Sequence, residues 1–225
     1  MNNNKIDFTA FPKVLFVTGT DTDAGKSWAT GWLAKSIARA GDTVITQKLI
    51  QTGNQDLSED IDVHRRVMGL SLQPRDLDHT TAPIILSYPA SPDLAAKIDK
   101  VDVDFGKATR STDILSSEYD HVLLEGAGGI MVPLKGDYLT LDYVREHHLP
   151  AALVTNGKLG SINHTLLALE IMKQAGVEVY ALVYNPHFDY DEIISADTRS
   201  YLHGYLKRRF PTTHYVEMPE NVLGE

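Results

Sequence analysis

The feature that most constrains this chain is a loop rich in glycine and threonine near its amino terminus. It follows Val14–Thr18, an apolar and partly β-branched segment typical of a buried strand. It leads into Lys26–Ala40, which has the pattern of a helix. Residues 19–27 read Gly-Thr-Asp-Thr-Asp-Ala-Gly-Lys-Ser. A loop of this kind between a strand and a helix binds phosphate with its backbone N–H groups and with the positive end of the helix.

This order of elements is that of a P-loop, in which the last two residues of the loop have separate roles. Lys26 would add positive charge beside the terminal phosphates, and the hydroxyl of Ser27 is placed to bind Mg²⁺. The standard spacing has Gly where this chain has Thr20, with Gly19 one residue earlier. A Gly-Lys-Ser tripeptide alone is common in loops, but a mere turn would leave Lys26 without a role. We therefore predict nucleotide binding.

Composition excludes several other classes of function. The 225 residues contain no Cys, which excludes thiolate metal sites and thiol catalysis and fits a reducing cytoplasm. The net charge of −9 argues against unspecific nucleic-acid binding, which depends on Lys and Arg. No apolar run approaches the roughly 20 residues of a membrane span, and residues 1–7 lack the apolar core of a secretion signal. We expect a cytoplasmic protein without a nucleic-acid or membrane partner.

Short apolar runs alternate with amphipathic stretches along the whole chain. The apolar runs predict five strands, near Val14–Thr18, Thr43–Lys48, His121–Glu125, Ala151–Thr155 and Val179–Tyr184. The amphipathic stretches predict six helices, over Lys26–Ala40, Asp60–Met68, Asp104–Ser117, Thr140–His147, Ile162–Ala175 and Asp191–Arg209. This alternation indicates an α/β fold with a mostly parallel central sheet and helices on both faces. Without a repeat or a linker, residues 1–225 are predicted to form one domain.

Each predicted strand is followed by a polar or glycine-rich cluster. Since ligands of open parallel sheets bind beyond the carboxyl ends of the strands, these clusters should share one edge. Glu125 is the candidate metal ligand there, directly or through water, because a carboxylate after a strand beside a P-loop commonly holds Mg²⁺. The glycines of residues 126–129 would let the backbone approach a ligand. The alternative is an ordinary acidic strand end before a flexible turn.

Two further candidates remain open from the residues alone. Asp60 could be a second magnesium carboxylate, but an acidic first helix turn explains it more simply. Glu59 or Asp62 would serve as well. Lys48 ends a predicted strand, where Lys is usually a solvated surface residue. At the ligand edge it could instead place a second cation beside the phosphates.

The nine His residues show no spacing typical of a metal site. His147 and His148 are adjacent, so they cannot face one ligand from the same side of a helix. We expect His64 and His164 at the surface or at helix caps. The basic run 207–209 is expected at the solvated end of a helix, where it complements the helix dipole.

As a set, these motifs resemble those of the dethiobiotin synthetases, the ATP-dependent enzymes that close the ureido ring in biotin biosynthesis. The resemblance extends from about Phe16 to Glu217. The segments that carry it are Val17–Ser27, Lys48–Gly53, Ser58–Asp60, Ser91–Ala96, Leu124–Gly129, Val132–Leu134, Lys158–His164 and Asn185. The first motif of the family also has Thr at the position of Thr20, which accounts for the unusual spacing. The family often has Glu where this chain has Asp23.

The resemblance implies a P-loop NTPase fold, a homodimer and a reaction. The substrates would be 7,8-diaminononanoate, CO₂ and MgATP. One amine would take up CO₂ as a carbamate, and a carbamate oxygen would attack the γ-phosphate. The second amine would then displace phosphate and close the five-membered ring. Catalysis of this kind consists mainly of positioning and charge stabilisation.

The resemblance also implies a role for each matching residue. Lys26 and Lys48 would be catalytic and bind the carbamate and the transferring phosphate. The metal ligands would be Ser27, Asp60 and Glu125. Asn185 would contact adenine, with backbone near Pro219. The full set at the ATP would be Thr20, Asp21, Thr22, Asp23, Ala24, Gly25, Lys26, Ser27, Glu125, Gly126, Ala127, Gly128, Asn185 and Pro219.

The substrate site implied by the resemblance lies partly at a dimer interface. Thr22 and Thr52 would hold the substrate within one subunit. A partner subunit would complete the site for the substrate carboxylate, in the region of Gly160, Ser161, Asn163 and Tyr201. No motif fixes the register between Asn185 and Tyr201.

Three other classes of nucleotide-binding protein fit less well. ATP-switch ATPases of the partitioning and nitrogenase type carry a signature Lys five residues before the P-loop Lys, where this chain has Asp21. The amidotransferase-type synthase of cobalamin synthesis needs a nucleophilic Cys, which the sequence lacks. A nucleotide-binding module that had lost catalysis would have no need to retain Lys26, Lys48, Ser27 and Glu125 together.

Overall fold

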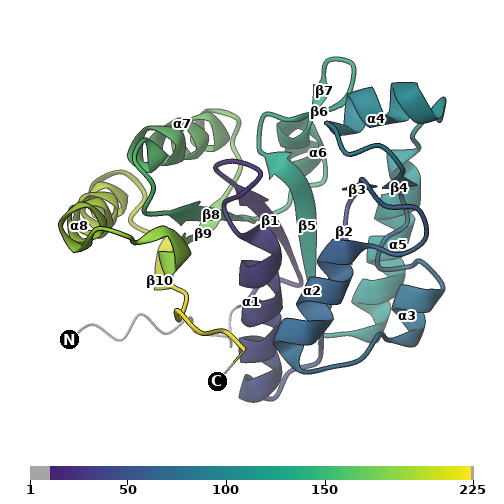
Figure 1. Cartoon of the computed structure of the whole chain (residues 1–225), viewed down its shortest axis with the longest axis horizontal. Coiled ribbons are helices and arrows are strands. Elements are labelled where there is room, and N and C mark those ends of the chain that lie inside the picture. The colour runs from purple at the N-terminus through teal and green to yellow at the C-terminus, as the bar shows by residue number, and fades with distance from the viewer. Residues whose placement is uncertain (1–10, 224–225) are drawn as a thin grey trace.

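The computed structural model describes residues 11–223, and its centre is a six-stranded parallel sheet (Figure 1). The strands of this sheet are β1 (Val14–Gly19), β2 (Val44–Lys48), β5 (His121–Gly129), β8 (Ala151–Asn156), β9 (Val179–Asn185) and β10 (His214–Glu217). Their spatial order is β10-β9-β8-β1-β5-β2. The mostly parallel sheet and its five predicted strands are confirmed, and β10 adds a strand that was not predicted. Residues 1–7, where no secretion signal is expected, lie outside the described residues.

The six predicted helices are confirmed, each within one residue of its predicted ends. They are α1 (Lys26–Ala40), α2 (Glu59–Met68), α5 (Phe105–Glu118), α6 (Thr140–Glu146), α7 (Ser161–Gln174) and α8 (Glu192–Arg209). The structure adds shorter elements, which are β3 (Gln51–Thr52), α3 (Pro74–Leu77), β4 (Ile85–Leu86), α4 (Pro92–Asp99), β6 (Pro133–Lys135), β7 (Tyr138–Leu139) and the 3₁₀ turn η2 (Pro186–Phe188). No helix among the described residues has the length and apolarity needed to cross a bilayer.

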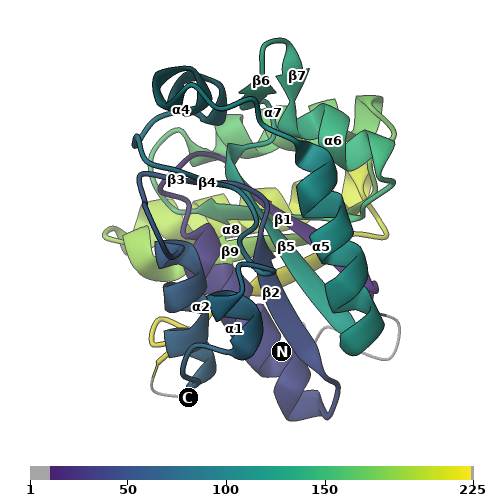
Figure 2. The same cartoon turned by 90° about the vertical axis from the view of Figure 1, so that its right-hand side faces the viewer.

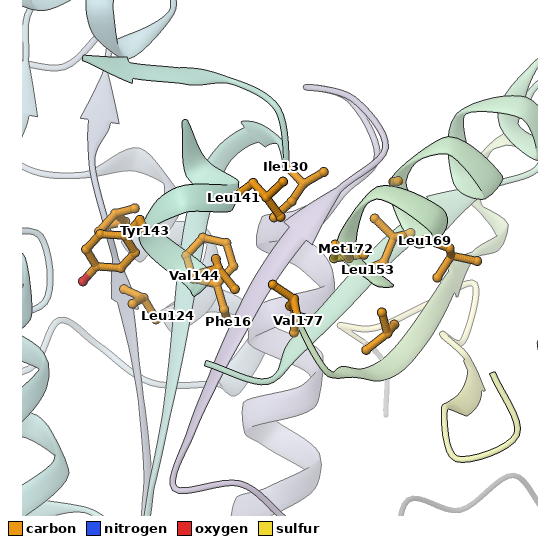
Figure 3. Packing of buried hydrophobic residues seen from close by; sticks show 14 of the residues in the cluster. Phe16, Leu124, Ile130, Leu141, Tyr143, Val144, Leu153, Leu169, Met172 and Val177 are labelled. Atoms are coloured by element: carbon orange, nitrogen blue, oxygen red, sulfur yellow. The ribbon is translucent and has the colours of Figure 1, made fainter. Parts of the chain in front are cut away.

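Successive residues of each central strand face different helical layers. Leu15 and Val17 of β1 pack in a cluster with α1 and α2, while Phe16 packs in a cluster with α5, α6, α7 and α8. Figure 3 shows this second cluster, with side chains of the sheet against α6 and α7. Figure 2 shows α5 alongside β5 and β2. Helices cover both faces of the sheet, so polar side chains gather at the edge formed by the carboxyl ends of the strands.

The helix that begins at the P-loop, α1, contacts α2 at Gly31. A Cβ on Gly31 would lie 2.8 Å from Cβ of Val67 and 3.2 Å from Cα of His64. The first distance is shorter than a carbon–carbon contact allows and the second is unusually tight, so a residue with a side chain would push the two helices apart. Since α1 carries Ser27 and α2 carries Asp60, this contact sets the separation of two candidate site residues.

We predict that Gly31→Ala lowers the free energy of unfolding by about 1–3 kcal/mol, because the overpacking outweighs the better helix propensity of Ala. The matched control is Gly204→Ala in α8, where an added Cβ would meet only the end of the Arg208 side chain, at 3.3 Å. This control should gain up to about 1 kcal/mol. Urea denaturation measures both, and equal shifts in the two variants would contradict the proposed role of Gly31.

Candidate functional site

The loop between β1 and α1 has a backbone shape that requires glycine at Gly25. This residue precedes α1 in the left-handed region, with φ of 89°. A Cβ at Gly25 would lie 2.1 Å from Nδ2 of Asn185. None of the described side chains caps the amino terminus of α1. The first N–H groups of the helix are therefore available to an anion held by the loop.

Lys26 is buried and folded back over its own loop. Its ammonium donates to the backbone oxygens of Asp21, at 2.9 Å, and Thr22, at 3.3 Å. Burial lowers the pKa of Lys26, and the charge of Lys48 lowers this pKa further. The positive charge of Lys26 therefore lies inside the P-loop. Its hydrogen-bond acceptors among the described residues are neutral carbonyl oxygens.

A fully buried carboxylate, that of Glu125, joins the remaining charged residues. Its Oε1 accepts a hydrogen bond from Nζ of Lys48 at 2.8 Å and lies 3.0 Å from Oγ of Ser27, whose one proton is within reach of both Glu125 and Asp60. Nζ of Lys48 also lies 2.5 Å from Oδ2 of Asp60 and donates to the carbonyl of Gly126 at 3.1 Å. Oγ of Ser27 lies 2.7 Å from Oδ1 of Asp60. Residues from α1, α2, β2 and β5 therefore meet beside the P-loop.

The charges of this cluster stabilise one another. Burial alone would raise the pKa of Glu125, but the adjacent Lys48 holds it well below its usual range. Burial alone would lower the pKa of Lys48, but Glu125 and Asp60 raise it above its usual value. Both groups are therefore ionised at neutral pH. Removing one partner of such a buried pair would leave the other charge uncompensated.

The oxygen atoms around Ser27 fit a nucleotide-bound Mg²⁺. Within residues 11–223, no group of three or more His, Cys, Asp or Glu side chains is arranged to hold a metal alone. At nucleotide sites Mg²⁺ takes only one or two protein ligands and completes its shell with phosphates and water. Oγ of Ser27 and the carboxylate of Asp60 supply hard oxygen ligands of this kind. Glu125 lies behind them, with both of its oxygens already in hydrogen bonds.

A cavity of about 660 Å³ opens in front of this cluster. It lies between the start of α1, the turn η2 and the carboxy-terminal segment of the described chain. The site residues predicted from sequence that line it are Thr22, Asp23, Gly25, Lys26, Ser27, Asp60, Asn185 and Pro219. Residues not predicted also line it, among them Trp28, Lys158, His187 and Phe188. Nζ of Lys158 lies 3.8 Å from the centre of the Phe188 ring. The volume suits a small-molecule ligand.

Asn185 links this cavity to the P-loop. Its Nδ2 donates to the carbonyl of Ala24 at 3.1 Å, and its Oδ1 accepts from the backbone N–H of His187, also at 3.1 Å. One amide proton of Asn185 remains for a ligand. Elsewhere in the loop, Oγ1 of Thr20 and Oδ1 of Asp21 are buried without a hydrogen-bond partner among the described residues.

The glycines after Glu125 lie in a strand and not in the flexible turn of the alternative interpretation. β5 continues to Gly129, which pairs with Gly19 of β1. Gly126, Ala127 and Gly128 are therefore held rigidly beside the P-loop. A Cβ on Gly128 would lie 2.8 Å from Cγ2 of Val132, a close approach that only Gly tolerates.

The predicted substrate residues outside the P-loop do not line this cavity. Thr52 lies half-buried in β3. Gly160 lines a second cavity of about 340 Å³ that Ile193 also lines. Ser161 follows it as the first residue of α7, while Asn163 and Tyr201 are exposed. The predicted roles of Gly160, Ser161, Asn163 and Tyr201 depend on a second subunit.

The prediction for His64 is wrong. This side chain is fully buried, with Nε2 2.7 Å from Oε2 of Glu125 and Nδ1 3.0 Å from Oγ1 of Thr46. The signal was present in the sequence, because Ile61, His64 and Val67 follow the spacing of a buried helix face. His164 is exposed, as expected.

A second residue that the sequence analysis missed, Thr30, also contacts Glu125. Its Oγ1 lies 2.9 Å from Oε2 of Glu125 and 2.8 Å from the carbonyl of Lys26. Because Thr30 stands one helical turn after Lys26, it lies on the same face of α1. That spacing could have identified it.

Comparison with known proteins identifies relatives along nearly the whole chain. A family model described as an AAA domain matches residues 13–216. The ATP-dependent dethiobiotin synthetase BioD 2 of Pasteurella multocida is 46% identical over 206 residues, which cover 92% of this chain and 97% of the relative. The ATP-dependent dethiobiotin synthetase BioD of Chlorobaculum tepidum is 48% identical over 196 residues, which cover 87% of this chain and 82% of the relative.

Solved structures with low sequence identity share the fold. The cell division protein FtsY of Thermotoga maritima is 15% identical with a TM-score of 0.54, over 99% of this chain and 67% of that one. A ParA family ATPase of Chlorobium tepidum is 15% identical with a TM-score of 0.52, over 93% and 86% of the two chains. These likenesses support the P-loop NTPase fold alone. On the evidence of the sequence relatives, the chain belongs to the ATP-dependent dethiobiotin synthetases, a family of ligases.

Proposed function

We propose that this protein uses ATP to join CO₂ to 7,8-diaminononanoate and to close the ureido ring of dethiobiotin. The names of the relatives support this assignment, and one structural observation carries it. Lys48, Ser27 and Asp60 gather around the buried carboxylate of Glu125, directly beside a P-loop. A site that only bound nucleotide would not need a second buried cation at this position.

The proposed reaction activates a carbamate with phosphate. One amine nitrogen forms a bond to the carbon of CO₂ and loses a proton, which gives the carbamate. A carbamate oxygen then attacks the γ-phosphorus, and the bond from phosphorus to the ADP oxygen breaks. The second amine attacks the carbonyl carbon of the resulting mixed anhydride and loses a proton. The C–O bond to phosphate breaks, so the products are the cyclic urea, ADP and phosphate.

The two lysines would stabilise the charge that develops on the transferring phosphoryl group. The ammonium of Lys26 would leave the carbonyls of Asp21 and Thr22 and bind the γ-phosphate in their place. Lys48 is already fixed by Glu125, so it would present its charge without reorganisation. Mg²⁺ would be held by Ser27 and Asp60, with Glu125 acting from behind them through water, and it would supply positive charge beside the β- and γ-phosphates.

The remaining predicted contacts describe how ATP and the diamine would lie. Residues 20–27 would bind the phosphates with backbone N–H groups, and residues 126–128 would border them. The free amide proton of Asn185 and the backbone near Pro219 would contact adenine in the cavity. Thr22 and Thr52 would hold the diamine.

A homodimer would complete the site for the substrate carboxylate around Gly160, Ser161, Asn163 and Tyr201. Two large apolar side chains near this region, Leu159 and Ile193, are 83% and 82% exposed. Both side chains line the same cavity as Gly160, which supports an interaction surface in this region.

We predict a dimer at micromolar concentration, measured by sedimentation velocity. Leu159→Asp should weaken the dimer, because it places a charge in the apolar contact, and should raise the KM for the diamine. The comparison is Leu77→Asp, a similarly exposed Leu at the end of α3. A protein that stays monomeric at all concentrations while closing the ring would contradict this part of the proposal.

We predict that ADP release depends on both diaminononanoate and bicarbonate as the source of CO₂, with one dethiobiotin formed per ADP. The physical reason is that the phosphoryl acceptor is the carbamate, which forms only when both are present. A coupled ADP assay with mass spectrometry of the product measures this ratio. Equal ADP release without the diamine would favour an ATP-switch protein instead.

Two variants test the roles of the lysines in the same assay. Lys26→Ala should reduce ADP release about 100- to 1,000-fold, the usual cost of removing one group that stabilises transition-state charge. It removes no partner of Glu125, so the fold should survive. Lys48→Arg keeps the positive charge opposite Glu125 but moves it, and should also impair ring closure. Normal product yield from either variant would refute the proposed chemistry.

A further inference from the structure

His64 belongs to the least exposed part of the site. It lies on α2 one turn after Asp60 and is fully buried. Its ring bridges Oε2 of Glu125, 2.7 Å from Nε2, and Oγ1 of Thr46, 3.0 Å from Nδ1. The resemblance to the synthetase family assigns no role to this residue, and the ring lines none of the cavity in front of the P-loop.

The hydrogen bonds of Thr46 assign the protons of the His64 ring. Nη1 of Arg65 donates to Oγ1 of Thr46 at 2.9 Å, so one lone pair of that oxygen is taken. The hydroxyl proton of Thr46 then points to Nδ1 of His64, which accepts it. Nε2 consequently carries the ring proton and donates it to Glu125. A proton on Nδ1 would leave the hydroxyl proton of Thr46 without an acceptor among the described contacts.

The far end of this chain of hydrogen bonds is anchored by a buried ion pair. Nε of Arg65 donates to Oδ2 of Asp76, and Nη2 donates to Oδ1, both at 2.8 Å. Burial alone would raise the pKa of Asp76, but the hydrogen bonds and charge of Arg65 lower it. Both residues are almost fully buried, so Arg65 has little freedom to turn away from Thr46.

The two oxygens of Glu125 consequently have different partners. Oε2 accepts from His64 and lies 2.9 Å from the hydroxyl of Thr30, and both of these residues belong to the interior. Oε1 accepts from Lys48 and lies 3.0 Å from the hydroxyl of Ser27, and both of these residues lie beside the P-loop. A rotation of the carboxylate would break bonds on both sides. Partners of this kind, one step behind the ligating residues, typically orient those residues.

We propose that His64 is a positioning residue for phosphoryl transfer, because its ring accepts from Thr46 at Nδ1, donates from Nε2 to Glu125 and so directs Oε1 toward Lys48 and Ser27. The proposal rests on the proposed function for its kinetic consequence. The proton assignment stands independently, since it concerns the protein without substrate.

Three variants of His64 separate positioning from simple packing. His64→Gln keeps an N–H donor at about the reach of Nε2, His64→Asn keeps one only at the reach of Nδ1, and His64→Leu fills the space without a donor. The Leu and Asn variants should lower kcat for ADP release about 10- to 100-fold. Their KM for ATP should stay within about twofold, because the P-loop is unchanged. His64→Gln should recover most of the lost kcat.

The matched control is His121→Leu. His121 is a buried His at the start of the strand that carries Glu125, and its Nδ1 lies 2.9 Å from the carbonyl oxygen of Pro12. This variant should lose stability without a change in kcat. Equal kcat in the Leu, Asn and Gln variants of His64, or a matching loss in His121→Leu, would overturn the positioning role.

Nitrogen-15 NMR of His-labelled protein without ligands tests the proton assignment directly. We expect a pyrrole-type signal for Nε2 of His64 and a pyridine-type signal for Nδ1, with the wild-type signals assigned by their loss in His64→Gln. The reverse pattern, or two protonated nitrogens, would overturn the inference even if the enzyme closes the ring. Absence of ring closure with the expected NMR pattern would instead refute the proposed function.

Discussion

The site depends on one negative charge that is held inside the protein. The carboxylate of Glu125 is fully buried, and an ion in that position is tolerated only if other groups replace its lost water. Four side chains do so, from β2, α1 and α2: Lys48, Ser27, Thr30 and His64. Each of these bonds fixes an element of the fold relative to β5. The charge that organises the chemistry therefore also organises the packing around it.

The parallel sheet makes this convergence possible. β1 and β2 both pair with β5, so the P-loop and Lys48 emerge on either side of Glu125. The close contact of α1 and α2 at Gly31 then brings Ser27 and Asp60 together. Lys26 differs from its neighbours, because its hydrogen bonds within residues 11–223 are to loop carbonyls, which it can exchange for phosphate oxygens. The site thus combines one adaptable cation with one that is fixed in advance.

Much of this arrangement could be predicted from the sequence. The long strands and helices have clear hydrophobic periods, and the P-loop and Glu125 follow apolar strands at the expected edge. β3, β4 and β7 contain two residues each, too few to show any period. Asp60 could not be chosen over Glu59 and Asp62 from sequence, because only tertiary packing directs it to Ser27 and Lys48. The surface prediction for His64 follows the usual exposure of polar residues on helices, but its spacing from Ile61 and Val67 places it on the buried face of α2.

The most direct test of this account is a crystal structure with ADP, Mg²⁺, the diamine carbamate and aluminium fluoride in place of the transferring phosphoryl group. In this complex, Nζ of Lys26 should have left the carbonyls of Asp21 and Thr22 and should bind the fluoride ligands. Lys48 should remain hydrogen-bonded to Glu125 and should lie beside the aluminium fluoride. A bound analogue with Lys48 and Glu125 well away from it, and Lys26 still on the loop carbonyls, would contradict the central claim.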